Sequence, residues 1–208
     1  MYGILVKNGL PMALMNSVTA LGCMVVQYFV NGLGVIYTSA YSVCSRYINF
    51  FMLPGVTLGM TMSSFTGQNF GAKKYERIQE GLRICLTIVF IAYLFTGSVM
   101  VFFPTFLAGF MLNGQDSISL AAQFLPVCGA MIIIVDCLFV FRSGVQGIGK
   151  PLIPMISGIA EMVMRIGVIL FFIADYGFIA TAFAEVAAWS SAFAINFIAY
   201  HLYLKKFR

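Results

Sequence analysis

The stretch ICLTIVFIAYLFTGSVMVFF, Ile84 to Phe103, runs for 20 residues without a charged side chain. The hydrocarbon core of a bilayer is about 30 Å thick, and a helix needs about 20 mostly apolar residues to cross it. Because the run is continuously apolar, it favours a spanning helix over a barrel strand, which would alternate. A helix also satisfies its own backbone hydrogen bonds where lipid offers no partners.

Five further apolar runs lie on either side of this one. Together they predict an all-α membrane protein, a bundle of six transmembrane helices that forms one domain over residues 1–208. The composition agrees, since 61% of the residues are hydrophobic and 9% are charged, whereas soluble domains carry about 25% charged residues. Pro54 is expected to bend the second run, which is too long for one straight span. The expected spans are 9–29, 33–65, 84–103, 118–141, 152–174 and 178–204.

Basic residues separate the two sides of this topology. With six spans, both termini and the even-numbered linkers share one side, and the intervening turns contain no Lys or Arg. Since cytoplasmic loops are enriched in these residues, the pattern predicts a plasma-membrane protein with both termini in the cytoplasm. The residues on the basic side are Lys7, Lys73, Lys74, Arg77, Arg83, Arg142, Lys150, Lys205, Lys206 and Arg208.

The linker TGQNFGAKKYERIQEGLR, Thr66 to Arg83, carries the densest charge. We expect Gly67 and Gly71 to allow a turn and an interfacial helix to begin at Lys73. No folded basic domain accompanies the linker, so its charge indicates orientation and excludes nucleic acid as a partner.

Several other classes are disfavoured. The five cysteines lie within the spans without a CxxC spacing, which indicates buried thiols and neither disulfides, a metal nor a cofactor. The single histidine, His201, sits at a span end, where an interfacial anchor is expected, and no catalytic constellation accompanies it. We therefore expect no enzyme. The first run lacks a short core with a small-residue cleavage site, so it is expected to remain in the membrane.

Five charged residues fall inside the expected spans: Arg46, Asp136, Glu161, Arg165 and Glu185. A charge near the bilayer centre costs at least about 2.5–3.5 kcal/mol, so such residues normally face a cavity or a partner. Glu161 and Arg165 are four residues apart, which stacks them on one helix face. They form either a structural ion pair or a carboxylate that binds a cation or proton in competition with Arg165.

Asp136 has no charged neighbour on its own helix face, since Arg142 is six residues away. Two hypotheses fit this carboxyl group. It either takes up and releases a proton or a small cation, or it is a neutral group that forms a hydrogen bond to another helix. Gln27, Tyr28 and Phe139 are candidate cavity walls because amide and aromatic groups suit flat cationic ligands. Glu185, four residues before Trp189, fits a ligand contact or a helix-packing hydrogen bond equally.

Five segments resemble landmarks of the multidrug and toxic compound extrusion (MATE) family, in the same order and at similar spacing. They are GLPMALMNSVTALG (9–22), SSFTGQNFGAKKYERIQEG (63–81), FRSGVQGIGKP (141–151), SGIAEMVMR (157–165) and FAEVAAW (183–189). They most resemble a bacterial, clostridia-like branch. The family has two six-helix lobes, and this sequence resembles the C-terminal lobe.

The resemblance implies an efflux antiporter that exports amphipathic or cationic drugs in exchange for Na⁺ or H⁺ by alternating access. Asp136 falls near the position of a family aspartate, and Glu161 with Arg165 matches a pair of the bacterial branch. These three residues are the candidates for cation or proton coupling. Arg46 and Glu185 join the candidate cavity residues. Thr19 stands where sodium-type members have an acid, so the standard sodium site is incomplete.

The resemblance covers one lobe only. Alternating access requires two lobes that move against each other, so we expect either a fragment of a longer transporter or a half-size protein that pairs with another lobe. A lipid-linked oligosaccharide flippase is a second hypothesis, disfavoured because only Arg46 and Arg165 are basic within the spans. A non-transporting scaffold is a third, and it predicts that the buried acids are dispensable.

Overall fold

The computed structural model describes residues 2–205, with the side chains of residues 4, 5, 7, 8 and 205 excepted. This part of the chain consists of eight helices joined by turns and contains no strand, which confirms the all-α prediction. The helices are α1 (Tyr2–Leu33), α2 (Val35–Phe51), α3 (Leu53–Gly71), α4 (Tyr75–Phe102), α5 (Pro104–Met111), α6 (Gln115–Gly147), α7 (Leu152–Tyr176) and α8 (Ile179–Lys205).

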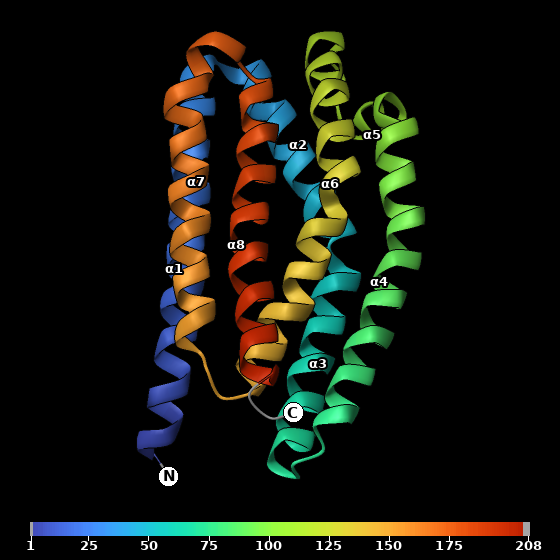
Figure 1. The fold of residues 1–208 in the computed structure, drawn as a ribbon. Helices are drawn as coiled ribbons and strands as arrows, with labels where there is room; N and C mark the ends of the chain where they lie inside the picture. The colour runs from blue at the N-terminus through green and yellow to red at the C-terminus, as the bar shows by residue number, and fades with distance from the viewer. Residues whose placement is uncertain (1, 206–208) are drawn as a thin grey trace.

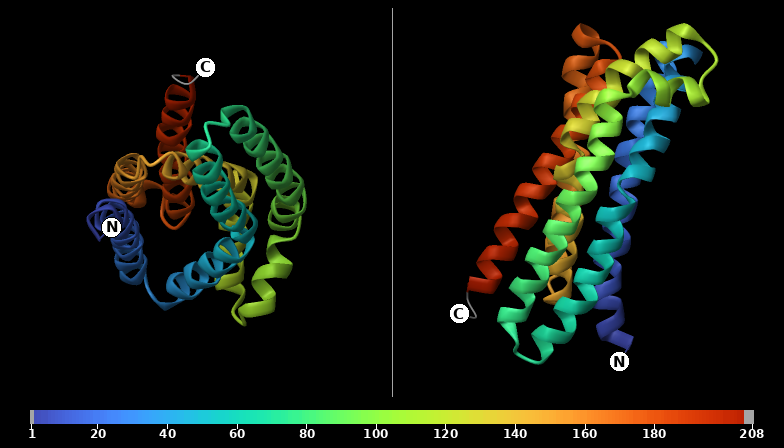
Figure 2. Two further views of the ribbon diagram at one scale, coloured as in Figure 1. Left: turned by 90° about the horizontal axis from the view of Figure 1, so that it is seen from below. Right: turned by 90° about the vertical axis from the view of Figure 1, so that its right-hand side faces the viewer.

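The long helices run side by side in an elongated bundle, with both ends of the chain at one end of it (Figures 1 and 2). Five segments of the described residues are long and apolar enough to span a membrane: Gly9–Leu33 and the whole or nearly the whole of α4, α6, α7 and α8. These five segments overlap the corresponding expected spans, so the chain is a multi-pass membrane protein.

The second expected span is divided between α2 and α3, which follow each other end to end (Figure 1). Pro54 has no backbone N–H to donate and lies in the first turn of α3. The hydrogen bonds from Met52 to Ile48 and from Val56 to Met52 flank this break, at 2.9 and 3.1 Å. The expected bend at Pro54 is therefore present as a one-residue break at Met52 between two helices that follow each other end to end.

The basic linker folds differently from the prediction. α3 continues through Gly67 to Gly71, and the turn consists of Ala72–Lys74, with Lys73 in the left-handed region at φ 57°. The next helix begins at Tyr75 rather than Lys73. A hydrogen bond of 2.8 Å from the Lys74 amide to the Asn69 carbonyl closes the end of α3.

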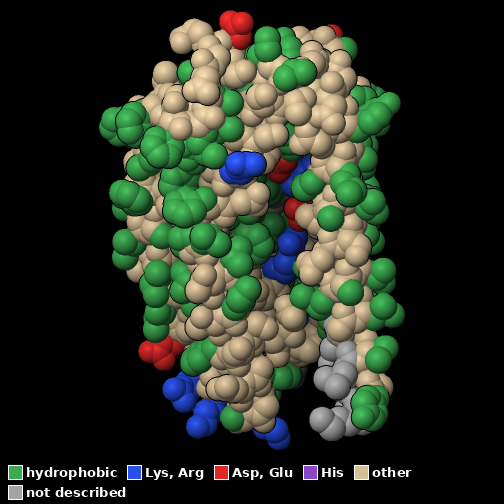
Figure 3. Space-filling model, turned by 180° about the vertical axis from the view of Figure 1, so that it is seen from behind, with side chains coloured by type: hydrophobic (Ala, Val, Ile, Leu, Met, Phe, Trp, Pro, Cys, Tyr) green, Lys and Arg blue, Asp and Glu red, His purple; other side chains and the backbone are tan. Residues whose placement is uncertain are grey.

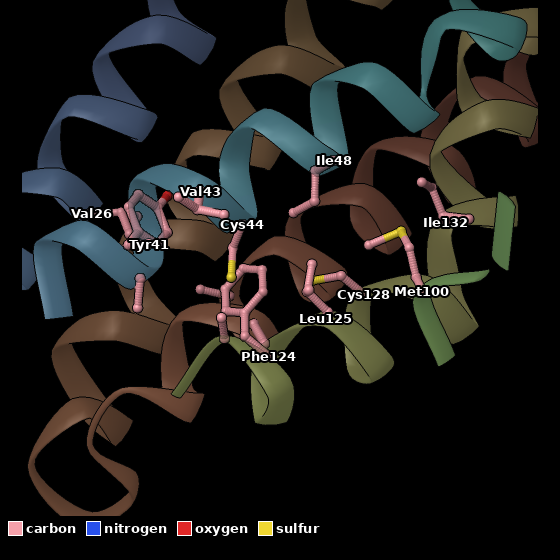
Figure 4. Close-up of a cluster of buried hydrophobic side chains, with 14 of the residues drawn as sticks. Val26, Tyr41, Val43, Cys44, Ile48, Met100, Phe124, Leu125, Cys128 and Ile132 are labelled. Atoms are coloured by element: carbon pink, nitrogen blue, oxygen red, sulfur yellow. The ribbon is translucent and has the colours of Figure 1, made fainter. Parts of the chain in front are cut away.

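α6 is the central helix and contacts α2, α3, α4, α5, α7 and α8, while α1 packs mainly on α7. Its buried residues join two hydrophobic clusters. One gathers side chains from α1, α2, α4, α6 and α8 around Phe124 (Figure 4), and the other joins α3, α4, α6 and α8 around Phe141. α6 therefore separates two regions of the bundle.

Lys and Arg side chains gather at one end of the molecule (Figure 3). The α3–α4 turn, with Lys73 and Lys74, and the α6–α7 turn, with Lys150, both lie at this end, as do the termini (Figure 1). Arg142 is an exception, because it is 7% exposed inside the bundle. The side chains of Lys7 and Lys205, and the whole of Lys206 and Arg208, lie outside the described residues.

Candidate functional site

A cavity of about 510 Å³, open on one side, lies among α1, α2, α6, α7 and α8. Seen from behind, the bundle is hollowed there, and acidic and basic side chains are visible within the hollow (Figure 3). The volume lies within the range of small-molecule sites, about 300–1,000 Å³. Its charged lining residues are Arg142, Glu161, Arg165 and Glu185.

A continuous chain of ion pairs runs along this wall. Arg142 of α6 donates to Glu161 of α7 at 2.8 Å, and Arg165 donates to the other oxygen of Glu161 at 3.4 Å. Arg165 also donates to Glu185 of α8 at 2.8 Å. The predicted pair of Glu161 and Arg165 is thus the longest of the three contacts, and each partner has a shorter contact to a neighbouring helix.

Uncharged groups extend the chain at the Arg165 end. The hydroxyl of Tyr41, on α2, donates to Glu185 at 3.3 Å, and the second terminal nitrogen of Arg165 lies 3.5 Å from the sulfur of Cys23 on α1. Five helices therefore meet at this network. Such a network holds the helices in one arrangement only while every member keeps its partner.

The charges are buried and balanced. Glu161 is 5% exposed and Arg165 is 2% exposed, so water screens their interaction poorly. The positive charges of the two arginines balance the negative charges of the two glutamates, which allows all four groups to remain charged inside an apolar bundle. The Nε atoms of Arg142 and Arg165 have no hydrogen-bond partner among the described residues, so each guanidinium retains a donor.

Asp136 lies apart from this network. It is fully buried on α6, and neither carboxylate oxygen has a hydrogen-bond partner in the described part of the chain. It does not line the cavity, although its neighbours Val135, Leu138 and Phe139 do. The side chain instead packs against Gly55, beside the break between α2 and α3. The structure therefore separates Asp136 from the other two candidate coupling residues.

The candidate cavity residues divide into two groups. Gln27, Phe139 and Glu185 line the cavity. Tyr28 is 75% exposed and packs edge-on against Phe29, and Arg46 is exposed on α2; neither is among the residues that line this cavity. On α2, the residues that line the cavity are Tyr41, Ser45, Ile48 and Asn49. Arg46, one residue after Ser45, points about 100° away on the helix.

Sequence reasoning missed Arg142, which it assigned to the cytoplasmic linker. α6 continues past this residue to Gly147 and holds it within the bundle. The sequence did contain a signal that the helix continues past Arg142, because no further charged residue follows until Lys150. Thr19 also lines the cavity, and its buried hydroxyl has no partner among the described residues.

No group of three or more potential metal ligands from His, Cys, Asp and Glu occurs within the described residues. The five cysteines are free, three of them buried. The polar atoms available to a ligand at the cavity therefore come from carboxylates, guanidinium groups, amides and hydroxyls.

A bundle of membrane-spanning helices around a partly charged cavity defines a multi-pass membrane protein. The sequence model of the MatE family matches residues 11–173, more than half of the chain. The chain belongs to this family, whose solved members are described as transporters, in accord with the expectation of no enzyme.

The relatives extend this assignment. The probable multidrug resistance protein YoeA of Bacillus subtilis (strain 168) is 24% identical over 127 residues, which are 60% of this chain and 27% of YoeA. The fold is similar to that of the Vibrio cholerae MATE transporter VcmN in the bent form, with a TM-score of 0.89 and 18% identity over 98% of this chain and 47% of VcmN. The fold is also similar to that of a MOP superfamily transporter from Pyrococcus furiosus, with a TM-score of 0.83. The two chains are 21% identical, and the match covers 98% of this chain and 45% of that transporter. The chain thus spans less than half the length of each of these relatives.

Proposed function

We propose that this chain is one lobe of a two-lobed efflux antiporter that exports amphipathic, cationic compounds in exchange for Na⁺ or H⁺. The observation that carries the proposal is a solute-sized cavity walled by four buried charges inside a membrane bundle. A protein that only had to fold in the bilayer would fill this volume with apolar side chains, because each buried charge costs at least about 2.5–3.5 kcal/mol on its own.

The comparisons support a missing partner lobe. The chain matches the solved transporters over nearly its whole length but spans 47% of VcmN and 45% of the Pyrococcus protein. We propose that α2 and α3 together make one crossing, which gives six crossings with the five apolar helices. The second lobe would then close the cavity from the side of α1 and α2 and keep lipid away from its charges.

The proposed location is the inner membrane of a bacterium, with the basic end of the bundle in the cytoplasm. The gathering of Lys73, Lys74 and Lys150 at the same end as both termini supports this orientation. The relative YoeA comes from a bacterium. Assignment to the clostridia-like branch remains a proposal that rests on the five sequence landmarks.

The cavity suggests how a cationic solute is recognised. Phe139 and Trp189 offer aromatic faces, and Gln27 offers an amide. Flat cations bind such faces through their positive charge. A bound cation would compete with Arg165 for Glu185 or with Arg142 for Glu161, so solute binding would loosen a contact that joins two helices.

Ion coupling is assigned to Asp136. Because a lone carboxylate is expensive in an apolar interior, a bound proton or cation stabilises the packing of Asp136 against Gly55. Loss of that ion leaves a charge at the joint between α2 and α3. The helix break at Pro54 lets that joint move, which would link ion binding to opening of the lobe. Glu161, with Arg165 and Arg142 bound to it, would act on the solute side.

The test uses a full-length, two-lobed transporter that contains this sequence. Asp136→Asn should remove the dependence of fluorescent-cation efflux on pH and on sodium, and Glu161→Gln should reduce efflux under all conditions. Asp116→Asn, an exposed acid on the same helix, is the matched control and should leave efflux unchanged. Efflux that survives both substitutions at every pH and sodium concentration would refute the coupling and favour a scaffold.

The flippase hypothesis gains no support from the cavity. Arg142 replaces Arg46 among its lining residues, so the number of basic side chains stays at two, and both are neutralised by Glu161 and Glu185. A net positive wall, which an anionic lipid-linked sugar would require, is therefore missing among the residues described.

A further inference from the structure

A second cavity, of about 660 Å³, lies between α4 and α8. α6 separates it from the charged cavity, because Phe141 lines the second cavity whereas Phe139 and Arg142 line the first. The second cavity is thus on a different side of the bundle. It plays no part in the proposed transport site.

Its walls are mostly apolar. Leu82 and Leu86 of α4 face Phe197 and Leu204 of α8, with Phe141 at the base. Both helices also carry exposed hydrophobic side chains, such as Phe90 of α4 at 53% and Ile198 of α8 at 55%. A cavity of this kind in a membrane-spanning bundle suits a hydrocarbon chain.

Two basic side chains also line it, Arg83 and His201. Arg83 lies eight residues into α4, about 12 Å along the helix, and His201 lies four residues before the end of α8. α4 begins and α8 ends at the same end of the bundle, where the basic turns gather (Figure 1). The polar part of the cavity is therefore near the expected bilayer surface.

His201 is held in a fixed orientation. Its Nδ1–H donates to the Phe197 carbonyl at 2.9 Å, which leaves Nε2 for another partner. Its ring lies 4.3 Å from the ring of Phe197 between centroids, and 5.9 Å from that of Phe141. None of the three ion pairs among the described residues includes Arg83, and its side chain is exposed.

We propose that this cavity binds an anionic phospholipid such as phosphatidylglycerol, with an acyl chain against the leucine and phenylalanine walls and the phosphate at Arg83 and His201. Basic pockets between helices on the cytoplasmic side favour anionic headgroups. Arg83 supplies a forked donor that matches phosphate oxygens, and His201 in its imidazolium form donates to the phosphate from Nε2–H. The apolar walls favour a lipid over free phosphate, because free phosphate would leave the leucine and phenylalanine side chains uncovered.

Native mass spectrometry of the complete chain tests the proposal. After equilibration with equal amounts of phosphatidylglycerol and phosphatidylcholine of the same chain length, the protein should retain several-fold more phosphatidylglycerol. The double substitution Arg83→Gln and His201→Gln should abolish the preference. Arg77→Gln, which removes a basic residue of α4 that lines a different pocket, should preserve it. Equal retention of the two lipids by the unmodified protein would overturn the proposal.

A second measurement needs no substitution. His201 is the only histidine of the chain, and its reaction with diethyl pyrocarbonate can be followed by mass spectrometry of the peptide that contains it. Phosphatidylglycerol nanodiscs should slow this reaction several-fold relative to phosphatidylcholine nanodiscs, and inorganic phosphate added to the latter should not. Equal rates in the two lipids would contradict the proposal, and protection by inorganic phosphate alone would show an anion site without a lipid. Neither result depends on transport.

Discussion

The guanidinium of Arg165 lies 2.8 Å from the carboxylate of Glu185 and joins α7 to α8 inside the bundle. The same group contacts Glu161 at 3.4 Å, while Glu161 contacts Arg142 at 2.8 Å. Every charge on the cavity wall thus has a partner on another helix. Stability and the proposed recognition of a solute would therefore depend on the same four side chains.

Arg165→Gln should lower the free energy of unfolding by about 3–5 kcal/mol, because it leaves Glu185 as a buried charge without a countercharge. Thermal unfolding in detergent, followed by circular dichroism, measures the loss. The matched control is Arg46→Gln at an exposed arginine, which should change the free energy by less than about 0.5 kcal/mol. Similar values for the two variants would mean that the ion pairs contribute nothing.

Gly55→Ala should destabilise the fold by about 1–3 kcal/mol, because overpacking forces well-packed helices apart. A Cβ at Gly55 would lie 2.6 Å from the Cα of Asp136, which is backbone and has no room to move aside. In Gly109→Ala, the new methyl group meets nothing within 4 Å, and the change should stabilise α5 by about 0.5–1 kcal/mol. Chemical unfolding of both variants tests the contrast, and equal effects would exclude a close contact of α3 with α6 at Gly55.

Asp136→Asn should leave the stability unchanged or raise it, since neither oxygen of Asp136 has a partner to lose. Glu161→Gln should instead lower it, because Arg142 and Arg165 lose their shared countercharge. Melting temperatures of the two variants in one detergent give the comparison. A clear loss of stability in Asp136→Asn would reveal a structural bond and weaken the assignment of ion coupling to this residue.

Cys23 should react with N-ethylmaleimide faster than the other four cysteines. It is the only exposed cysteine of the five and lines the charged cavity, whereas Cys44, Cys85 and Cys128 are buried. Peptide mass spectrometry after a short reaction identifies the labelled site, with Cys23→Ser as the control. Earlier labelling of Cys44 or Cys128 would contradict the arrangement of α1 and α2 around the cavity.

The sequence allowed the helices to be predicted because each apolar run is long and ends at charges or turns. The pairing of Glu161 with Arg165 could also be predicted, since both lie on one helix at a spacing of four. The contacts to Arg142 and Glu185 join residues 19 and 20 positions apart, and they depend on how three helices pack. Helical periodicity within one segment carries no information about such packing.

Two residues were misplaced, for different reasons. The depth of Arg46 in an apolar run suggested a buried charge, but depth along a helix does not determine which face is exposed. Arg142 was placed at the surface because it follows the run, although α6 extends past it by five residues to Gly147. The split of the second span at Pro54 was foreseen as a bend, because a missing N–H is a local property that the residue type alone reveals.

The ion pairs also constrain the order in which the protein enters the membrane during synthesis. Arg165 leaves the ribosome 20 residues before Glu185, so α7 on its own offers Arg165 only the longer contact to Glu161, at 3.4 Å. Insertion of α7 alone would expose Arg165 to lipid at a cost of about 2.5–3.5 kcal/mol. Entry of α7 and α8 as a hairpin, joined by the short turn at Gly177, removes that cost. We therefore expect the last two helices to insert together.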